Sequence, residues 1–153
     1  MVNIVEGSDI VKNYNSFCAL NRINFFVKKG EILGFLGPNG AGKTTLIKLI
    51  TCTSKLTSGK LILFEREIEG NERFIKSKIG VVPQDNNLDP DFTVRENLLV
   101  YSRYFFIKKD RAVKVIDDLL NFVNLNDRKD TNVADLSGGM KRRLIIARSL
   151  INN

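Results

Sequence analysis

Eight residues from Gly37 to Thr44 constrain this chain more than any other segment, because they read Gly-Pro-Asn-Gly-Ala-Gly-Lys-Thr. They match the pattern G-x-x-x-x-G-K-[ST] of a phosphate-binding loop at every fixed position. The apolar run Ile32–Leu36 before the motif predicts a buried strand, and Thr45–Ile50 after it predicts an amphipathic helix. Glycines between a strand and a helix are the setting that the motif requires, so we expect the loop to hold a nucleoside triphosphate. A glycine-rich turn that binds nothing is the alternative.

The residue types in this loop suit phosphate chemistry. Glycines let the backbone curl with its amides pointing inward, and a helix N-terminus adds partial positive charge. Lys43 is expected to reach the outer phosphates, and Thr44 to offer its hydroxyl to a magnesium ion.

A second motif lies about ninety residues further on. Leu136–Met140 reads Leu-Ser-Gly-Gly-Met and precedes a basic and then apolar run that ends at Leu150. It resembles the signature sequence of ATP-binding cassette (ABC) ATPases, with Met140 where glutamine is usual. Gln84, after the predicted strand end Val81–Pro83, stands between the two motifs as in that family. The resemblance runs the whole length of the chain.

The resemblance implies an α/β fold, a P-loop NTPase of the ABC ATPase type with an N-terminal antiparallel β region, a helical subdomain and an incomplete C-terminal core. Within the family, Val82–Gln84 and Leu88–Leu99 look most similar to exporters of drugs and of lipid-linked oligosaccharides, nodulation-factor exporters included.

The resemblance also assigns roles to residues. The residues expected to bind ATP are Tyr14, Gly37, Pro38, Asn39, Gly40, Ala41, Gly42, Lys43, Thr44 and Thr45. Tyr14 would stack on adenine, with a core tyrosine as the alternative. Thr44 and Gln84 would contact Mg²⁺, with an exposed loop glutamine as the alternative for Gln84. Ser137, Gly138 and Gly139 would bind the outer phosphate of a nucleotide held by a second subunit, so a dimer is implied.

The family's hydrolytic groups have no counterpart in the sequence. The family continues into its Walker B strand, which carries a metal-binding aspartate and a water-orienting glutamate, at the point where this sequence reaches Ile151 to Asn153. The chain contains no histidine, so the family's switch histidine is missing too. No catalytic residue is therefore predicted, and we expect little ATP turnover from these residues alone.

Composition is that of one globular domain. Of the 153 residues, 43% are hydrophobic and 27% are charged. The best apolar stretch, Leu98–Ile107, is interrupted by Ser102 and Arg103 and is too short to span a bilayer. Met1–Glu6 lacks the order of a secretory signal, which favours the cytoplasm. Any membrane role is expected to come through a polytopic permease.

The net charge of +7 permits an anionic partner, but the basic residues are scattered without interleaved aromatics, so no nucleic acid is expected. The run Lys141–Arg143 is the exception. It falls in the first turns of a predicted helix, where the macrodipole disfavours cations, so a nearby anion or a solvated basic face would explain it.

The chain is expected to divide into three parts of one nucleotide-binding domain: 1–30 as the antiparallel β region, 31–85 as the P-loop core, and 86–153 as the helical subdomain with the signature helix. Strands are predicted at Asp9–Lys12, Asn21–Val27, Lys60–Phe64 and Ile79–Val82. Thr93 with Glu96 predicts a helix cap, and helical spacing of apolar residues continues from Ala112 to Val123.

Three functions fit these observations. The first is the ATP-binding motor subunit of an exporter, acting on a separate membrane partner. The second is a binding-only nucleotide module without turnover. The third is an ABC protein that acts on ribosomes or DNA, which the positive charge would permit.

Overall fold

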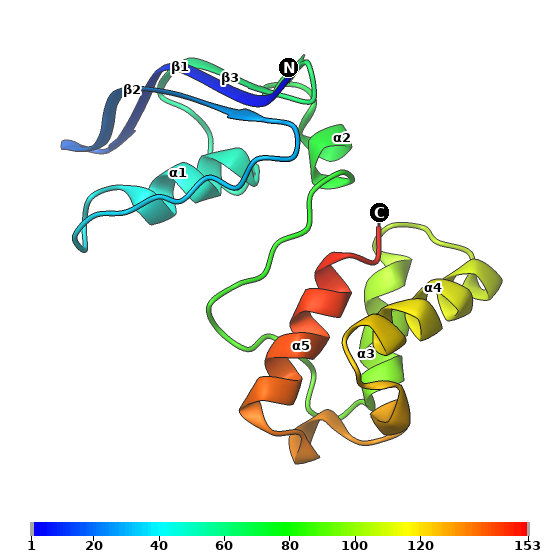
Figure 1. The fold of residues 1–153 in the computed structure, drawn as a ribbon. Helices are drawn as coiled ribbons and strands as arrows, with labels where there is room; N and C mark the ends of the chain where they lie inside the picture. Colours follow the sequence, from blue (N-terminus) through cyan, green and yellow to red (C-terminus); the bar gives the residue numbers. More distant parts are fainter. Residues whose placement is uncertain (1, 153) are drawn as a thin grey trace. The chain divides into compact units, whose positions relative to one another are not determined.

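A computed structural model describes residues 2–152, which form two compact units that divide after Lys76. Figure 1 shows the elements of both. The first unit contains β1 (Asn3–Tyr14), β2 (Phe17–Lys28), α1 (Lys43–Ile50), β3 (Ser58–Leu63), β4 (Arg66–Glu67) and α2 (Glu72–Lys76). The second contains α3 (Val94–Arg103), α4 (Lys109–Phe122), the 3₁₀ turns η1 (Asn126–Arg128) and η2 (Val133–Asp135), and α5 (Gly138–Ser149).

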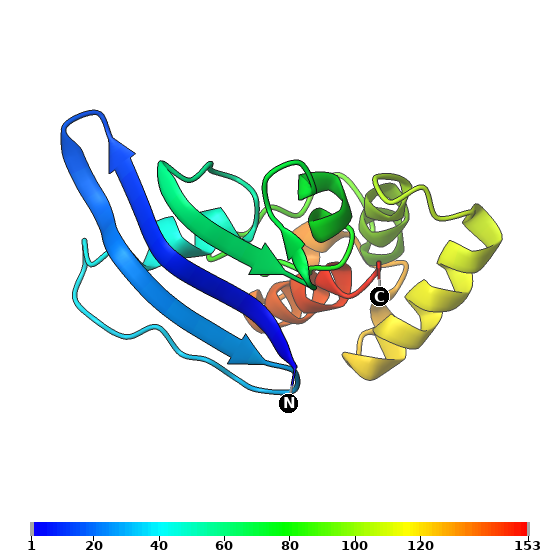
Figure 2. The same cartoon turned by 90° about the horizontal axis from the view of Figure 1, so that it is seen from above.

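The first unit is built on a four-stranded antiparallel sheet in the order β2-β1-β3-β4. β1 and β2 form a long hairpin, seen from above in Figure 2, in which Ile10 pairs with Ile23. The turn at its tip includes Asn15 in the left-handed conformation that this residue type tolerates. The predicted antiparallel strands and the predicted strand at Lys60–Phe64 are confirmed.

The helix α1 follows the glycine-rich loop and lies against β2. Leu46 and Leu49, three residues apart on one helix face, are buried on this helix that contacts β2, and Leu20 of β2 is buried too. This packing fixes the position of the helix, and therefore of the loop that leads into it.

The buried strand predicted at Ile32–Leu36 is absent. Residues 31–38 form neither helix nor strand, and Ile32 and Leu36 are 98% and 95% exposed. Phe35 alone packs inward, edge to face with Phe25 at 6.0 Å between ring centroids. A strand needs a neighbour to pair with its amides and carbonyls, and no strand among residues 2–152 pairs with this segment.

The strand predicted at Ile79–Val82 is absent for the same reason. This segment instead runs beside the end of α5, where a Cβ on Gly80 would lie 2.0 Å from the carbonyl oxygen of Ser149. Only glycine allows so close a backbone approach.

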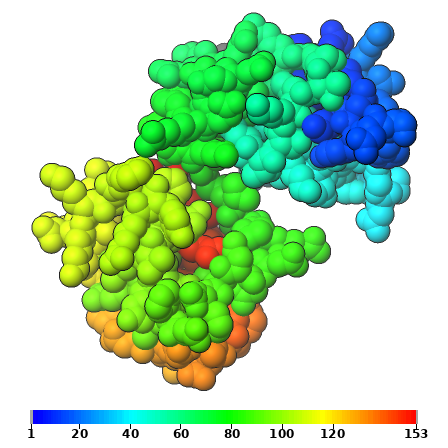
Figure 3. All heavy atoms as spheres, turned by 180° about the vertical axis from the view of Figure 1, so that it is seen from behind, coloured from blue at the N-terminus to red at the C-terminus, as the bar shows by residue number. Residues whose placement is uncertain are grey.

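The second unit is a small helical body. Its core is formed by apolar side chains of α3, α4 and α5 and of the turns between them, among them Val94, Leu98, Ile116, Leu120, Leu125, Leu144 and Ala147. Figure 3 shows this unit as spheres, with the end of α5 in red partly hidden between the yellow-green and green atoms of the same unit. The predicted capping box is confirmed: the Thr93 side chain accepts from the amide of Glu96, whose carboxylate accepts from the amide of Thr93 at 2.8 Å.

Candidate phosphate-binding site

The glycine-rich loop depends on two left-handed glycines. Gly40 and Gly42 have φ values of 85° and 84°, which glycine adopts without steric strain. A Cβ on Gly42 would also lie 2.7 Å from the carbonyl oxygen of Ala19 on β2. Gly42 is the N-cap of α1, so the same residue turns the chain, seats the loop against the sheet and starts the helix.

The side chain of Lys43 folds back into this loop. Its ammonium donates to the carbonyl oxygens of Gly37 at 2.7 Å and Pro38 at 2.6 Å. The first turn of α1 contains no acidic residue. The loop therefore gathers an ammonium and a helix N-terminus, both of which attract an anion.

The other predicted loop residues lie on the surface. Pro38, Asn39 and Ala41 are exposed, and the amide of Ala41 donates to the carbonyl of Pro38 at 3.3 Å. Thr44 is exposed in the first turn of α1, where its hydroxyl is available to a ligand, and Thr45 beside it is half-buried.

Tyr14 lies beside this helix. Its side chain is 43% exposed at the end of β1, and Lys12 places its ammonium 4.8 Å from the ring centroid. A hydrogen bond with Ser54, and more weakly one with Thr45, lowers the pKa of Tyr14. The structure thus brings Tyr14 to the helix that begins at Lys43, with part of its side chain open to a ligand.

The signature motif forms the start of α5. Ser137 is the N-cap, and its hydroxyl accepts from the amide of Met140 at 3.3 Å. Gly138 and Gly139 occupy the exposed first turn, and a Cβ on either would meet nothing within 4 Å. Amides of a first helical turn have no partner within the helix, so this end of α5 can receive an anionic group.

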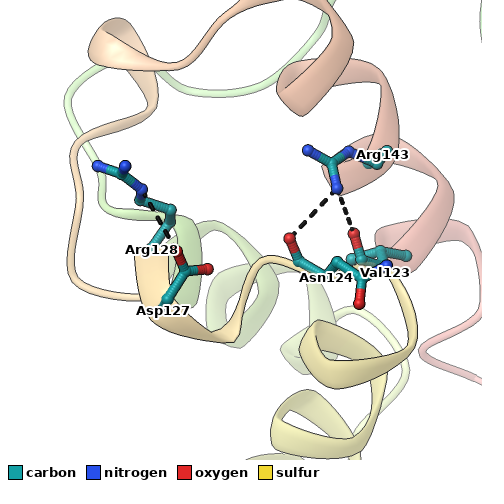
Figure 4. A network of polar contacts seen from close by, with 5 residues as sticks. All are labelled: Val123, Asn124, Asp127, Arg128 and Arg143. Atoms are coloured by element: carbon teal, nitrogen blue, oxygen red, sulfur yellow. Dashed lines mark hydrogen bonds and ion pairs between the residues drawn. The ribbon is translucent and has the colours of Figure 1, made fainter.

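The basic run after the motif binds backbone carbonyls. Lys141 donates to the Ala134 carbonyl at 3.1 Å and Arg142 to that of Pro83 at 2.5 Å. Arg143 donates to the carbonyl of Val123, the C-cap of α4, at 3.0 Å and to that of the next residue, Asn124, at 3.2 Å (Figure 4). These cations therefore stabilise neighbouring segments of the unit, which explains their position without an anion.

Gln84 lies in an exposed loop of the second unit, between Pro83 and the helix α3. Thr44 belongs to the first unit, so a magnesium site shared by these two residues stays a prediction. Among residues 2–152 there is no group of three or more His, Cys, Asp or Glu side chains that could hold a metal ion.

Sequence reasoning missed Arg148. This arginine is 8% exposed and donates to the carbonyl of Asn87 at 3.0 Å and to its side-chain amide oxygen. Its guanidinium lies 4.9 Å from the ring centroid of Tyr101, and burial lowers the pKa of Arg148. A signal was present, because Arg148 follows Leu144 by four residues and so shares its buried helix face.

Comparison with known proteins identifies the family of this chain. The sequence model of the family described as ABC transporter matches residues 20–153. The chain belongs to this family, and its fold is that of the family's ATP-binding domain.

Its curated relatives include two proteins called Nod factor export ATP-binding protein I. The one from Burkholderia orbicola is 44% identical over 149 residues, which are 97% of this chain and 49% of the relative. The one from Rhizobium etli is also 44% identical, over 97% of this chain and 47% of the relative. The chain thus spans about half the length of the curated relatives it matches.

Solved structures give the same fold. The cbiO1 protein of Clostridium perfringens, described as part of an ABC transporter complex, superposes with a TM-score of 0.89 at 28% identity, over 98% of this chain and 62% of that one. An ATP-binding cassette of an ABC transporter in its ADP conformation gives 0.84 at 28% identity, over 100% and 66%. No helix within residues 2–152 has the length and apolar character to cross a bilayer.

Proposed function

We propose that this chain is the ATP-binding part of an ABC exporter's motor subunit. The observation that carries the proposal is the position of Lys43, whose ammonium lies inside the glycine-rich loop at the start of α1. Relatives named for ATP binding and Nod factor export, 44% identical to this chain, support the same function.

Binding would begin with an exchange of partners at Lys43. The triphosphate would replace the Gly37 and Pro38 carbonyls as acceptor for the ammonium, and charge-assisted hydrogen bonds to phosphate are stronger than bonds to neutral carbonyls. The loop amides and the N-terminus of α1 would complete the cradle. Thr44 would offer its hydroxyl to Mg²⁺, which neutralises phosphate charge.

The nucleotide base would rest on Tyr14. The partly exposed ring at the end of β1 offers a face to a purine, and its contact with Thr45 places it beside the helix that binds the phosphates. Lys12, against the same ring, adds a positive charge near the bound nucleotide.

Ser137, Gly138 and Gly139 would meet the nucleotide of a second subunit. Their amides at the open end of α5 suit a terminal phosphate, and pairing of two copies would enclose two nucleotides.

A polytopic permease would dock on the segment after Gln84. This segment borders a cavity of about 200 Å³ in the second unit. Its lining residues include Asp89, Phe92, Asn97, Tyr101, Tyr104 and Arg148. The buried Asn97 accepts from the amide of Asp89 at 2.9 Å and donates to its carbonyl at 3.0 Å, which fixes the rim. The chain would thereby be held at the cytoplasmic face of the membrane.

Nucleotide binding is tested by titrating the purified chain with a fluorescent ATP analogue and displacing it with ATP, ADP or AMP. We expect ATP to displace the analogue better than AMP, because the loop binds the outer phosphates. Equal displacement by AMP would contradict the proposed site.

Permease docking is tested by cross-linking in membranes. A cysteine replacing Asp91, in a Cys18→Ser and Cys52→Ser background, should capture a polytopic membrane protein, whereas a cysteine replacing Asp118 on α4 serves as the control. Recovery of only ribosomal proteins or DNA would instead support the function on ribosomes or DNA.

A further inference from the structure

Two arginines of α5 hold the two ends of the loop that carries Gln84. Arg142 donates to the carbonyl oxygen of Pro83 at 2.5 Å, and Arg148 donates to the carbonyl oxygen of Asn87 at 3.0 Å. The three residues between these anchors, which include Gln84, are exposed. The conformation of this loop is therefore set by side chains of the helix that begins with the signature motif.

The two anchors differ in strength. Arg148 is buried, makes a second bond to the side chain of Asn87 and contacts the ring of Tyr101. A charged hydrogen bond away from water is stronger than one at the surface. Arg142 is exposed and makes one bond. The Asn87 end is thus the fixed end of the loop, and the Pro83 end is the one that can open.

The Pro83 anchor acts on the peptide next to Gln84. The carbonyl that Arg142 holds belongs to the peptide group that joins Pro83 to Gln84, so the bond restrains the backbone from which the Gln84 side chain extends. Ser137, the cap of the same helix, lies five residues before Arg142, about 7.5 Å along a rigid α-helix.

We propose that Arg142 is a positioning residue for Gln84 and links it to the signature motif within one subunit. A phosphate bound at Ser137 and Gly138 would fix the start of α5, and Arg142 would pass that restraint to Gln84. This inference rests on the proposed function and on the contact with Mg²⁺ of bound ATP that the family resemblance implies for Gln84.

The experiment compares Arg142→Ala with Lys141→Ala in the full chain. Lys141 is the matched control, because it lies on the same helix turn and its ammonium binds the carbonyl of Ala134, outside the loop. A spin label on Asp85→Cys, in a Cys18→Ser and Cys52→Ser background, reports loop mobility. ATP affinity is measured with Mg²⁺ and with a chelator.

Arg142→Ala should at least double the rotational mobility of the label and reduce the strengthening of ATP binding by Mg²⁺ at least threefold. ATP affinity without Mg²⁺ should not change, and Lys141→Ala should alter neither quantity. Arg142→Lys, which keeps a donor, should retain at least half of the Mg²⁺ effect.

Unchanged label mobility in Arg142→Ala would overturn the inference. A more mobile loop with an unchanged Mg²⁺ effect would also overturn it, because the bond from Arg142 to Pro83 would then have a structural role only. Should Arg142→Ala fold poorly by circular dichroism, Asn87→Ala, which removes the amide acceptor at the other end, is expected to give a smaller mobility increase. No increase there would also count against the link. Failure of the proposed function would appear separately, as an unmodified chain that binds no ATP.

Discussion

The ammonium of Lys43 donates to the carbonyl oxygen of Pro38 at 2.6 Å, across the loop that both residues belong to. The bond closes the glycine-rich loop around its own cation. Under the proposed function, a phosphate would compete with the carbonyls of Gly37 and Pro38 for this ammonium.

The two left-handed glycines of the loop should differ in their tolerance of alanine. Alanine at either position is destabilised by about 1–2 kcal/mol by the left-handed backbone. A Cβ at Gly42 would also clash with the carbonyl of Ala19, whereas a Cβ at Gly40 would meet nothing within 4 Å. Gly42→Ala should therefore lower the free energy of unfolding clearly more than Gly40→Ala in urea titrations. Equal losses would show that the contact between loop and β2 is not maintained in solution.

Tyr14 should contribute to base binding and leave phosphate binding unchanged. Tyr14→Ala is expected to weaken ATP about fivefold, since stacking contributes on the order of 1 kcal/mol, while Tyr14→Phe keeps the ring and most of the affinity. Tripolyphosphate, which has no base, should bind all three proteins equally. A parallel loss of tripolyphosphate binding in Tyr14→Ala would assign the ring a structural role.

The cap of α3 should stabilise the second unit through the Thr93 hydroxyl. Thr93→Ala removes the acceptor for the Glu96 amide and should cost about 1 kcal/mol of unfolding free energy. Thr93→Ser keeps the hydroxyl and is the control, expected to lose much less. Identical unfolding midpoints for the two variants would contradict this account of the cap.

The same cap predicts a pH dependence. Hydrogen bonds from the backbone and then the side chain of Thr93 lower the pKa of Glu96 below its ordinary 4.5. Because the pKa of this carboxylate is lower in the folded state than in the unfolded chain, its ionised form stabilises the protein at pH values above the ordinary pKa. This stabilisation is lost as the pH falls through the folded-state pKa. Glu96→Gln should thus be less stable than the unmodified chain at pH 6–7, with the difference shrinking below about pH 4.5. A gap that stayed constant from pH 7 to 3 would refute the assignment.

The sequence predicted the local features well. A hydroxyl three residues before a glutamate located the start of α3, alternating residues located the β1–β2 hairpin, and the signature motif located the start of α5. Each of these depends on contacts within a few residues or on one neighbouring strand, which periodicity and capping chemistry record directly.

The predictions of strands at Ile32–Leu36 and Ile79–Val82, by contrast, were wrong. Ile32–Leu36 and Ile79–Val82 have the apolar character of strands, but a strand forms only beside a partner, and residues 2–152 provide none for either. Strand pairing depends on a partner segment that is distant in the sequence, and an apolar run alone does not indicate whether such a partner exists. The anchors of the Gln84 loop were missed for a related reason, because Arg148 meets Asn87 across 61 residues.

The most direct test of the central claim is the ATP dissociation constant of the unmodified chain, of Lys43→Ala and of Lys60→Ala, measured by equilibrium dialysis. Lys60 is the control because its ammonium pairs with Glu67 on the sheet surface and takes no part in the loop. If the loop binds nucleotide through Lys43, removing that ammonium should weaken ATP at least tenfold, about 1.4 kcal/mol, while Lys60→Ala binds as the unmodified chain does. Equal affinity of Lys43→Ala and the unmodified chain would contradict the account.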